Sequence, residues 1–162
     1  MTGSLSQETV IQYPLALQAY WQGQRLLKLE LCFASQCPSG PKPSCPGSRL
    51  GQCLQDYLQG RQAAVADLTL AWELLSDFQI LVLSRLQAGV GKGQWISYQG
   101  LAELCGRPRA ARAVGRVMAK NPWPLLVPCH RVLAGGGKLG GFSSGLQMKR
   151  FLLNLEGIAY QE

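Results

Sequence analysis

The residues with the clearest chemical potential are Cys129 and its neighbour His130. His130 is the only histidine among 162 residues, and histidine is the side chain whose ordinary pKa lies closest to neutral pH. A nearby base can convert a cysteine to the nucleophilic thiolate. Consecutive side chains of an extended segment point in opposite directions, so His130 need not touch the sulfur and can act through a water. The pair predicts a nucleophilic centre, although a Cys–His dipeptide by itself often arises by chance.

A histidine that works as a base needs an acid to orient it, and acids are scarce in this part of the chain. After residue 76 the acidic residues are Asp77, Glu103, Glu156 and Glu162. Glu156 lies on the last expected helix, and we select it as the partner of His130.

Positive charge is concentrated in the same half as Cys129. The net charge is +7; basic and acidic residues balance over residues 1–76, so all of the excess follows. Arg109, Arg112, Arg116 and Lys120 recur at helical spacing, with the small residues Ala113 and Gly115 among them. This stripe predicts a helix that lies against the phosphates of DNA. A solvated basic face is the alternative.

The first half predicts a small α/β arrangement. Residues 26–33 alternate between apolar and polar, as in a half-buried strand, and residues 35–47 are rich in Pro, Ser and Gly, as in a loop. Ser48 can cap a helix that Gly60 ends. Residues 61–76 are expected to be part strand and part linker.

The second half predicts helices. Ser76 or Asp77 caps one, Ser97 caps a second, and Pro108 fits the first turn of a third. The second and third form an expected helix-turn-helix. In a last helix, over residues 146–157, the expected inward side chains are Met148, Phe151, Leu152 and Leu155.

Two further patterns suggest ligands. The glycine-rich run "GGGKLGGFSSG" contains a GxGxxG match, but it lies too near the C-terminus to open a dinucleotide-binding βαβ unit. Its glycines instead favour a loop that closes over a flat ligand, or a mobile surface loop. Cys32, Cys37, Cys45 and Cys53 could form a zinc site or a disulfide, but their spacing matches no common site and ordinary thiols are expected.

The sequence around Cys129 resembles the active-site signature of the O6-alkylguanine-DNA alkyltransferases, which are methylated-DNA–protein-cysteine methyltransferases. The matching residues are "PCHR", the following Val132 and the preceding "NPWPLLV". The segments "ISYQGLAELCG", "AARAVG", "GGFSSGL" and "LLNLEG" are similar to family segments in the same order. The resemblance covers residues 77–157 well; before them only "LQDYLQG" is similar.

The resemblance implies an α+β protein. Residues 1–74 would form a small β-sheet domain with a helix, and residues 75–162 a winged helix-turn-helix domain that holds Cys129. Cys129 would be the nucleophile, His130 its base and Glu156 the residue that orients His130.

The remaining roles are also implied by the resemblance alone. Tyr98 would donate a proton or hydrogen bond to guanine, Arg112 would fill the gap left by the flipped nucleotide, and Asn121 would be a structural hinge. Backbone groups of Cys129, Val132 and Ser143 would read the base edge, and the glycine-rich loop with Gly140 and Phe142 would form one wall of the pocket. DNA contacts would come from Arg109, Arg112, Ala113, Gly115, Arg116 and Lys120.

Three departures from the family pattern stand out. Phe142 occupies a position where tyrosine is frequent, which removes a hydroxyl but keeps the ring. Trp123 replaces a smaller aliphatic residue, so the sequence does not determine the width of the pocket. Some relatives bind zinc in the N-terminal domain through Cys and His, and no histidine is present there, so no metal site is carried over.

The sequence therefore predicts a DNA repair protein that moves an alkyl group from O6 of guanine in duplex DNA onto Cys129. We expect a single turnover, no cofactor, a monomer, and a cytoplasmic location, nucleoid-associated in a prokaryote, because neither a signal peptide nor a membrane span is recognisable. Three alternatives remain open: a relative that only binds alkylated DNA, a Cys–His hydrolase, and a helix-turn-helix regulator.

Overall fold

The computed structural model describes residues 3–37, 48–61 and 65–162. It separates into two compact units, Met1–Trp72 and Glu73–Glu162. The expected domain division after residue 74 falls near this boundary, and it stays a prediction of how the chain divides into independently folding parts.

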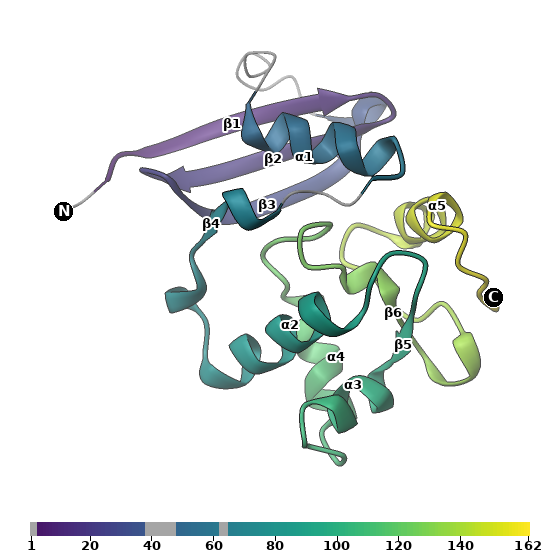
Figure 1. Ribbon diagram of the computed structural model, residues 1–162. Helices are drawn as coiled ribbons and strands as arrows, with labels where there is room; N and C mark the ends of the chain where they lie inside the picture. Colours follow the sequence, from purple (N-terminus) through teal and green to yellow (C-terminus); the bar gives the residue numbers. More distant parts are fainter. Residues whose placement is uncertain (1–2, 38–47, 62–64) are drawn as a thin grey trace. The chain divides into compact units, whose positions relative to one another are not determined.

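The N-terminal unit is built on a four-stranded sheet (Figure 1). β1 (Leu5–Gln12), β2 (Leu15–Gln22) and β3 (Arg25–Phe33) are antiparallel neighbours, and the short β4 (Thr69–Leu70) pairs parallel to β3. Gly23 has a φ of +60°, which a two-residue turn between β2 and β3 requires. The strand expected over residues 26–33 and the short strand expected within 61–76 are confirmed.

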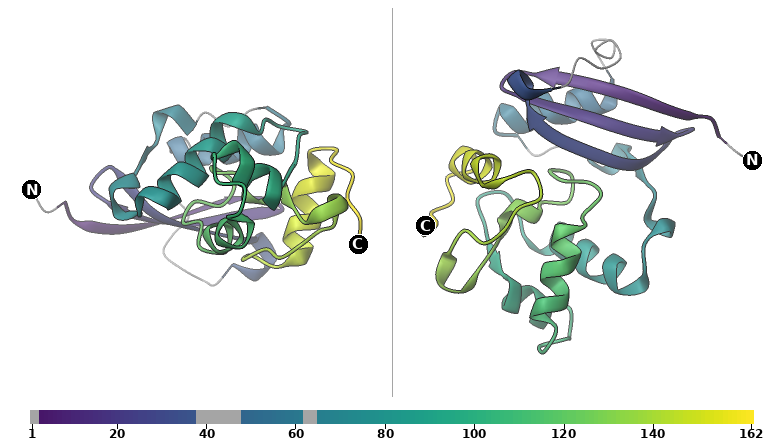
Figure 2. Two further views of the ribbon diagram at one scale, coloured as in Figure 1. Left: turned by 90° about the horizontal axis from the view of Figure 1, so that it is seen from below. Right: turned by 180° about the vertical axis from the view of Figure 1, so that it is seen from behind.

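A single helix, α1 (Arg49–Leu58), covers one face of this sheet, as two opposite views show (Figures 1 and 2). The Ser48 hydroxyl accepts a hydrogen bond from the Gly51 N–H at 3.0 Å, so the predicted cap is confirmed. The helix buries Leu50, Cys53, Leu54 and Tyr57. Burying this apolar stripe is what holds so short a helix in place.

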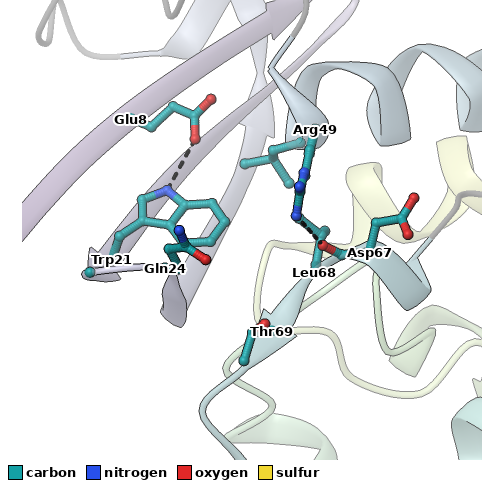
Figure 3. A pocket seen from close by; sticks show the side chains of 9 residues that line it. Glu8, Trp21, Gln24, Arg49, Asp67, Leu68 and Thr69 are labelled. Atoms are coloured by element: carbon teal, nitrogen blue, oxygen red, sulfur yellow. Dashed lines mark hydrogen bonds between the residues drawn. The ribbon is translucent and has the colours of Figure 1, made fainter.

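A cavity of about 310 Å³ lies inside the N-terminal unit. Two hydrogen bonds lie along its lining (Figure 3): Trp21 Nε1 donates to Glu8 Oε2 at 3.0 Å, and Arg49 Nη1 donates to the Asp67 carbonyl at 3.1 Å. Its lining residues include neither cysteine nor histidine. It therefore offers no thiol or imidazole for catalysis.

The C-terminal unit begins with three helices, α2 (Asp77–Gly89), α3 (Tyr98–Leu104) and α4 (Ala111–Ala119). They pack against one another. Ser76 forms a reciprocal capping box with Gln79, and Ser97 accepts from the Gly100 N–H at 2.9 Å. Both predicted caps are confirmed, and α3 and α4 form the expected helix-turn-helix.

A second, small sheet and a final helix complete this unit. β5 (Ile96–Ser97) pairs parallel to β6 (Val132–Leu133), and α5 (Leu146–Leu155) follows the glycine-rich segment. β5 runs directly into α3, which begins at Tyr98, and β6 directly follows the turn that begins at Cys129. This pairing therefore fixes Tyr98 and Cys129 near one another. Within the described residues, no helix is long and apolar enough to cross a membrane.

The expectation that Pro108 sits in the first turn of the third helix is wrong. The helix begins at Ala111, and Pro108 lies in a turn closed by a hydrogen bond from the Ala110 N–H to the Arg107 carbonyl at 2.9 Å. Proline's fixed φ suits the second position of such a turn as well as a helix start. As a result, Arg109 precedes the helix and Lys120 caps its end, and of the four cations only Arg112 and Arg116 lie within it.

The inward face expected for the last helix is also partly wrong. Met148 and Leu152 are buried, but Leu155 is 37% exposed and Phe151 is only partly buried. Lys149 and Leu153 are fully buried in their stead. The buried face of α5 is therefore rotated about the helix axis relative to the expected face. The apolar pattern did not predict this because one of the buried residues is a lysine.

Candidate active site around Cys129

Cys129 opens a short 3-10 turn, Cys129–Arg131, immediately before β6. The residue is 3% exposed, and its backbone N–H donates to the Val127 carbonyl at 2.8 Å. The preceding loop contains Leu125 with a φ of +75°, the one described non-glycine residue in the left-handed region. A conformation this unfavourable persists only where surrounding contacts impose it.

Asn121 supplies those contacts. Its Nδ2 donates to the Val127 carbonyl at 2.9 Å, and its Oδ1 accepts from the Trp123 N–H at 3.0 Å. This buried amide joins the end of α4 to the Cys129 segment, and its role as a hinge stays a prediction.

The Cys129 sulfur borders a pocket of about 250 Å³. The pocket is formed by the first residue of α3, the second half of α4, the Cys129 turn and the segment before α5. Its lining residues are Tyr98, Gly115, Met118, Ala119, Cys129, Gly141, Phe142 and Ser143. The helix that carries Arg112 and Arg116 on its exposed side thus also forms a wall of the pocket.

The expected pocket residues divide into two groups. Phe142 and Ser143 line the pocket. Gly140 lies behind Tyr98 instead: its φ is +64°, and a side chain there would meet the Tyr98 ring and hydroxyl at 3.3 Å. Val132 is fully buried and outside the lining. Gly115, expected at the DNA surface, lines the pocket as well.

Trp123 does not narrow the pocket. It is fully buried and is not among the lining residues. Its bulk belongs to the core beneath the Cys129 loop, so the pocket keeps a small-residue wall at Gly115 and Ala119.

His130 and Glu156 form a buried pair. His130 Nε2 and Glu156 Oε1 are 2.7 Å apart, and both side chains are fully inaccessible. Arg131 Nε and Nη2 donate to the same carboxylate at 2.8 and 3.0 Å, and the Gly93 N–H donates at 3.3 Å. The structure therefore brings together the base and the acid that the sequence paired.

Burial sets the protonation states of these groups. It lowers the pKa of His130, which outweighs the opposite effect of Glu156. Burial alone would raise the pKa of Glu156, but the hydrogen bonds from His130 and Arg131 outweigh it and hold that pKa far below its usual range. At neutral pH the pair is a neutral imidazole beside a carboxylate, which is the form able to accept a proton.

The Cys129 thiol is protonated at rest. Burial raises its pKa to about 11, against the opposing effects of the Asn121 hydrogen bond, the Lys149 charge and backbone N–H groups. A thiol in this state reacts only if a base removes its proton. Tyr98 also keeps its proton, because burial and the neighbouring Cys129 raise its pKa, and it remains a hydrogen-bond donor at the pocket.

Lys149 was not anticipated from the sequence. It is fully buried, and its Nζ donates to the Val132 carbonyl at 2.7 Å and to the Gly141 carbonyl at 3.2 Å. Burial lowers its pKa to about 8. These bonds tie the strand after Cys129 to the pocket segment. The only signal in the sequence is the lysine itself, and a lysine on an amphipathic helix is ordinarily expected at the surface.

The cations expected at DNA are all exposed: Arg109, Arg112, Arg116 and Lys120. Ala113 lies between them on α4 and is partly buried. None of the four cations forms an ion pair within the described part of the chain. Their charge is left uncompensated on one unit.

Among residues 3–37, 48–61 and 65–162, no group of three or more Cys, His, Asp or Glu could hold a metal ion. Cys45, one of the four cysteines considered for zinc, lies outside the described residues.

Comparison with known proteins identifies the family of this chain. The family model "6-O-methylguanine DNA methyltransferase, DNA binding domain" matches residues 77–158. Human methylated-DNA–protein-cysteine methyltransferase is 53% identical over 81 residues, 50% of this chain but 39% of its own length. The chain thus spans well under half of the mammalian relatives.

Other relatives match over most of their length. The methylated-DNA–protein-cysteine methyltransferase of Metallosphaera sedula is 35% identical over 136 residues, which cover 84% of this chain and 83% of that protein. The crystal structure of Mycobacterium tuberculosis OGT in complex with DNA has a TM-score of 0.75 and 33% identity, and covers 93% of this chain and 92% of that one. O6-methylguanine-DNA methyltransferase from Pyrococcus kodakaraensis has a TM-score of 0.74, 28% identity, and coverage of 96% and 100%. By sequence and by fold, this chain belongs to the methylated-DNA–protein-cysteine methyltransferase family.

Proposed function

We propose that this protein repairs DNA by transferring the alkyl group from O6 of guanine in duplex DNA to its own Cys129. The observation that carries this proposal is the pocket at Cys129. A buried thiol and a phenol that keeps its proton line this pocket. His130, the residue after Cys129, lies beside the Glu156 carboxylate.

The reaction we propose is a displacement at saturated carbon. His130 accepts the Cys129 proton through a water, and Glu156 stabilises the imidazolium that forms. The thiolate sulfur then forms a bond to the alkyl carbon while the bond from that carbon to O6 breaks. The bonding pair leaves with guanine, and Tyr98 donates a proton or hydrogen bond to the guanine anion. The step needs no oxidant, reductant or cofactor.

The pocket's position explains why a nucleotide would have to leave the helical stack. Cys129 is 3% exposed, and a base inside a duplex cannot reach a buried sulfur. We propose that Arg112 fills the space left by the flipped nucleotide, while Arg109, Arg116 and Lys120 contact phosphates. Gly115 and Ala119 of the pocket lining follow Arg112 by three and seven residues on α4, which places them on the same side of the helix. DNA binding and base capture would therefore use neighbouring positions of one short helix.

A duplex DNA substrate places the reaction wherever the cell keeps its DNA. We propose that a monomer suffices, because every residue in the proposed chemistry comes from one unit of one chain.

The test is to mix the protein with a duplex that contains one O6-methylguanine and to measure intact and peptide masses. We expect a gain of one CH₂ unit on the peptide that contains Cys129. Cys129→Ala should abolish the gain. Cys105→Ala is a matched control, because Cys105 is also buried, with a pKa raised by burial, but lies outside the pocket.

The alternatives give different results. A protein that only binds alkylated DNA would bind the alkylated duplex without gaining mass. A helix-turn-helix regulator would also bind DNA without gaining mass, and it would show no preference for the alkylated duplex. A hydrolase would turn over acyl substrates. Any of these results would reject the proposal.

A further inference from the structure

Arg131 has an unusual set of contacts for a residue beside a reactive centre. Its side chain is 12% exposed. Two of its nitrogens grip the Glu156 carboxylate, Nε to Oε2 at 2.8 Å and Nη2 to Oε1 at 3.0 Å. The third, Nη1, donates to the Val90 carbonyl at 2.9 Å. A planar fork bound at three points cannot rotate without losing bonds.

The Glu156 carboxylate that Arg131 binds is also the group that contacts His130. Glu156 Oε1 lies 2.7 Å from His130 Nε2 and also accepts from Arg131 Nη2. Oε2 accepts from Arg131 Nε and from the Gly93 N–H. The arginine fork therefore fixes which oxygen faces the imidazole, and it draws part of the carboxylate's charge away from His130.

We propose that Arg131 is a positioning residue that holds Glu156 against His130 and sets the pH range in which His130 can act as the base. The inference rests on the proposed function, since it concerns the same reaction. Arg131 itself is not among the residues that line the pocket.

The charges around His130 determine the direction of the effect. Glu156 favours the imidazolium, whereas Arg131 and Lys149 oppose it, and burial opposes it most. Cys129 precedes His130 in the chain and is protonated at rest, so it adds no charge. Without Arg131, the imidazole would face an anionic carboxylate with one cation fewer nearby. The pKa of His130 would then be higher, so the neutral imidazole, which is the base form, would predominate only at higher pH.

The single histidine makes this measurable without ambiguity. In a protein without a purification tag, every imidazole NMR signal comes from His130. We would record imidazole ¹⁵N shifts between pH 5 and 8 for wild type, Arg131→Met and Arg131→Lys. Arg150→Met is the control, because Arg150 belongs to the exposed ion pair with Glu162.

We expect His130 to titrate at higher pH in Arg131→Met than in wild type. A smaller upward shift is expected in Arg131→Lys, which keeps the cation and loses the fork. Arg150→Met should match wild type. An Arg131 variant whose His130 titrates at or below the wild-type pH would overturn the proposal. If Arg131→Met does not fold, the shift in Arg131→Lys decides alone.

Transfer rates give a second readout. Relative to its own rate at pH 8, Arg131→Met should lose on the order of tenfold more activity at pH 6 than wild type does, because like-charge contacts shift titrations by amounts of this size. An equal loss at both pH values would show a merely structural role. A wild-type protein that transfers no alkyl group would overturn the proposed function. If the wild-type protein transfers the alkyl group and His130 titrates at the same pH in Arg131→Met as in wild type, only the proposed role of Arg131 is overturned.

Discussion

The cavity in the N-terminal unit and the pocket at Cys129 are of similar size, about 310 and 250 Å³, yet their chemistry differs. In the N-terminal cavity, Trp21 bonds to Glu8 and Arg49 to backbone. In the C-terminal pocket, burial raises the pKa of Cys129 and Tyr98, and His130 lies beside an anionic Glu156. Volume alone does not separate the two, whereas the thiol at the C-terminal pocket and the imidazole–carboxylate pair that follows it in the chain do.

Charge separates the two regions in the same way. Basic and acidic residues balance over residues 1–76, and the remaining 86 residues hold the whole net charge of +7. A surface that binds a polyanion needs uncompensated cations, and these lie on the unit that also holds the thiol. The predictions below test whether the division is complete.

The largest effect after loss of Cys129 itself should come from His130→Ala. If His130 is the base, alkyl transfer should slow by on the order of 10²- to 10⁴-fold while DNA affinity stays near wild type. Glu156→Gln should give a partial version of the same defect, since it weakens the imidazole's orientation without removing it. Single-turnover rates measured beside a binding titration would show this. Near-wild-type rates in both variants would mean that Cys129 is activated in another way.

Arg112→Ala should affect duplex and free base differently. An inserted side chain compensates for unstacking, which costs about a few kcal/mol, so repair in duplex should fall far more than reaction with free O6-alkylguanine base. The comparison uses one protein and two substrates, so a general folding defect would lower both rates. Equal losses would remove Arg112 from the flipping step.

Arg116→Ala should weaken DNA binding uniformly across sequences. Losing one phosphate contact should reduce the slope of log affinity against log salt by about one unit, and Arg109→Ala and Lys120→Ala should do the same. Arg61→Ala is the control, because Arg61 lies in the N-terminal unit and pairs with Asp56 at 2.9 Å. An unchanged slope in the Arg116 variant, or an equal change in the control, would contradict the division of charge.

Glu8→Gln should have the smallest effect. The substitution keeps the shape of the N-terminal cavity and an acceptor for Trp21 Nε1, and it removes a charge that the proposed reaction does not use. Transfer rates and DNA affinity should match wild type. A measurable slowing of transfer at unchanged stability would show that the N-terminal cavity takes part after all.

The sequence predicted the C-terminal unit better than the N-terminal one, for identifiable reasons. In the C-terminal unit, Ser76 and Ser97 indicated the starts of two helices through their hydroxyls, which are local signals. β2 gave no alternation because its first five residues are all buried, so period-two reasoning had nothing to detect. Pro108 misled because a turn and a helix start require the same φ of proline.

The site shows the same limit. Cys129, His130 and Glu156 could be joined from composition, since only one histidine and few acids were available. Lys149 could not be found, because its role depends on two carbonyls, Val132 and Gly141, that only folding brings to its Nζ. The three-point grip of Arg131 is hidden for the same reason.

The central claim is that Cys129 accepts one alkyl group and keeps it. A thioether has no carbonyl for water to attack, and thiolate is a poor leaving group from saturated carbon, so the product should be permanent. The added group should also overpack the buried site and lower the free energy of unfolding by about 1–3 kcal/mol. The most direct measurement is titration with excess O6-methylguanine duplex, followed by peptide mass analysis. We predict one methyl group per protein, on Cys129, and no further repair; sustained turnover, or a methyl group on another cysteine, would contradict the account.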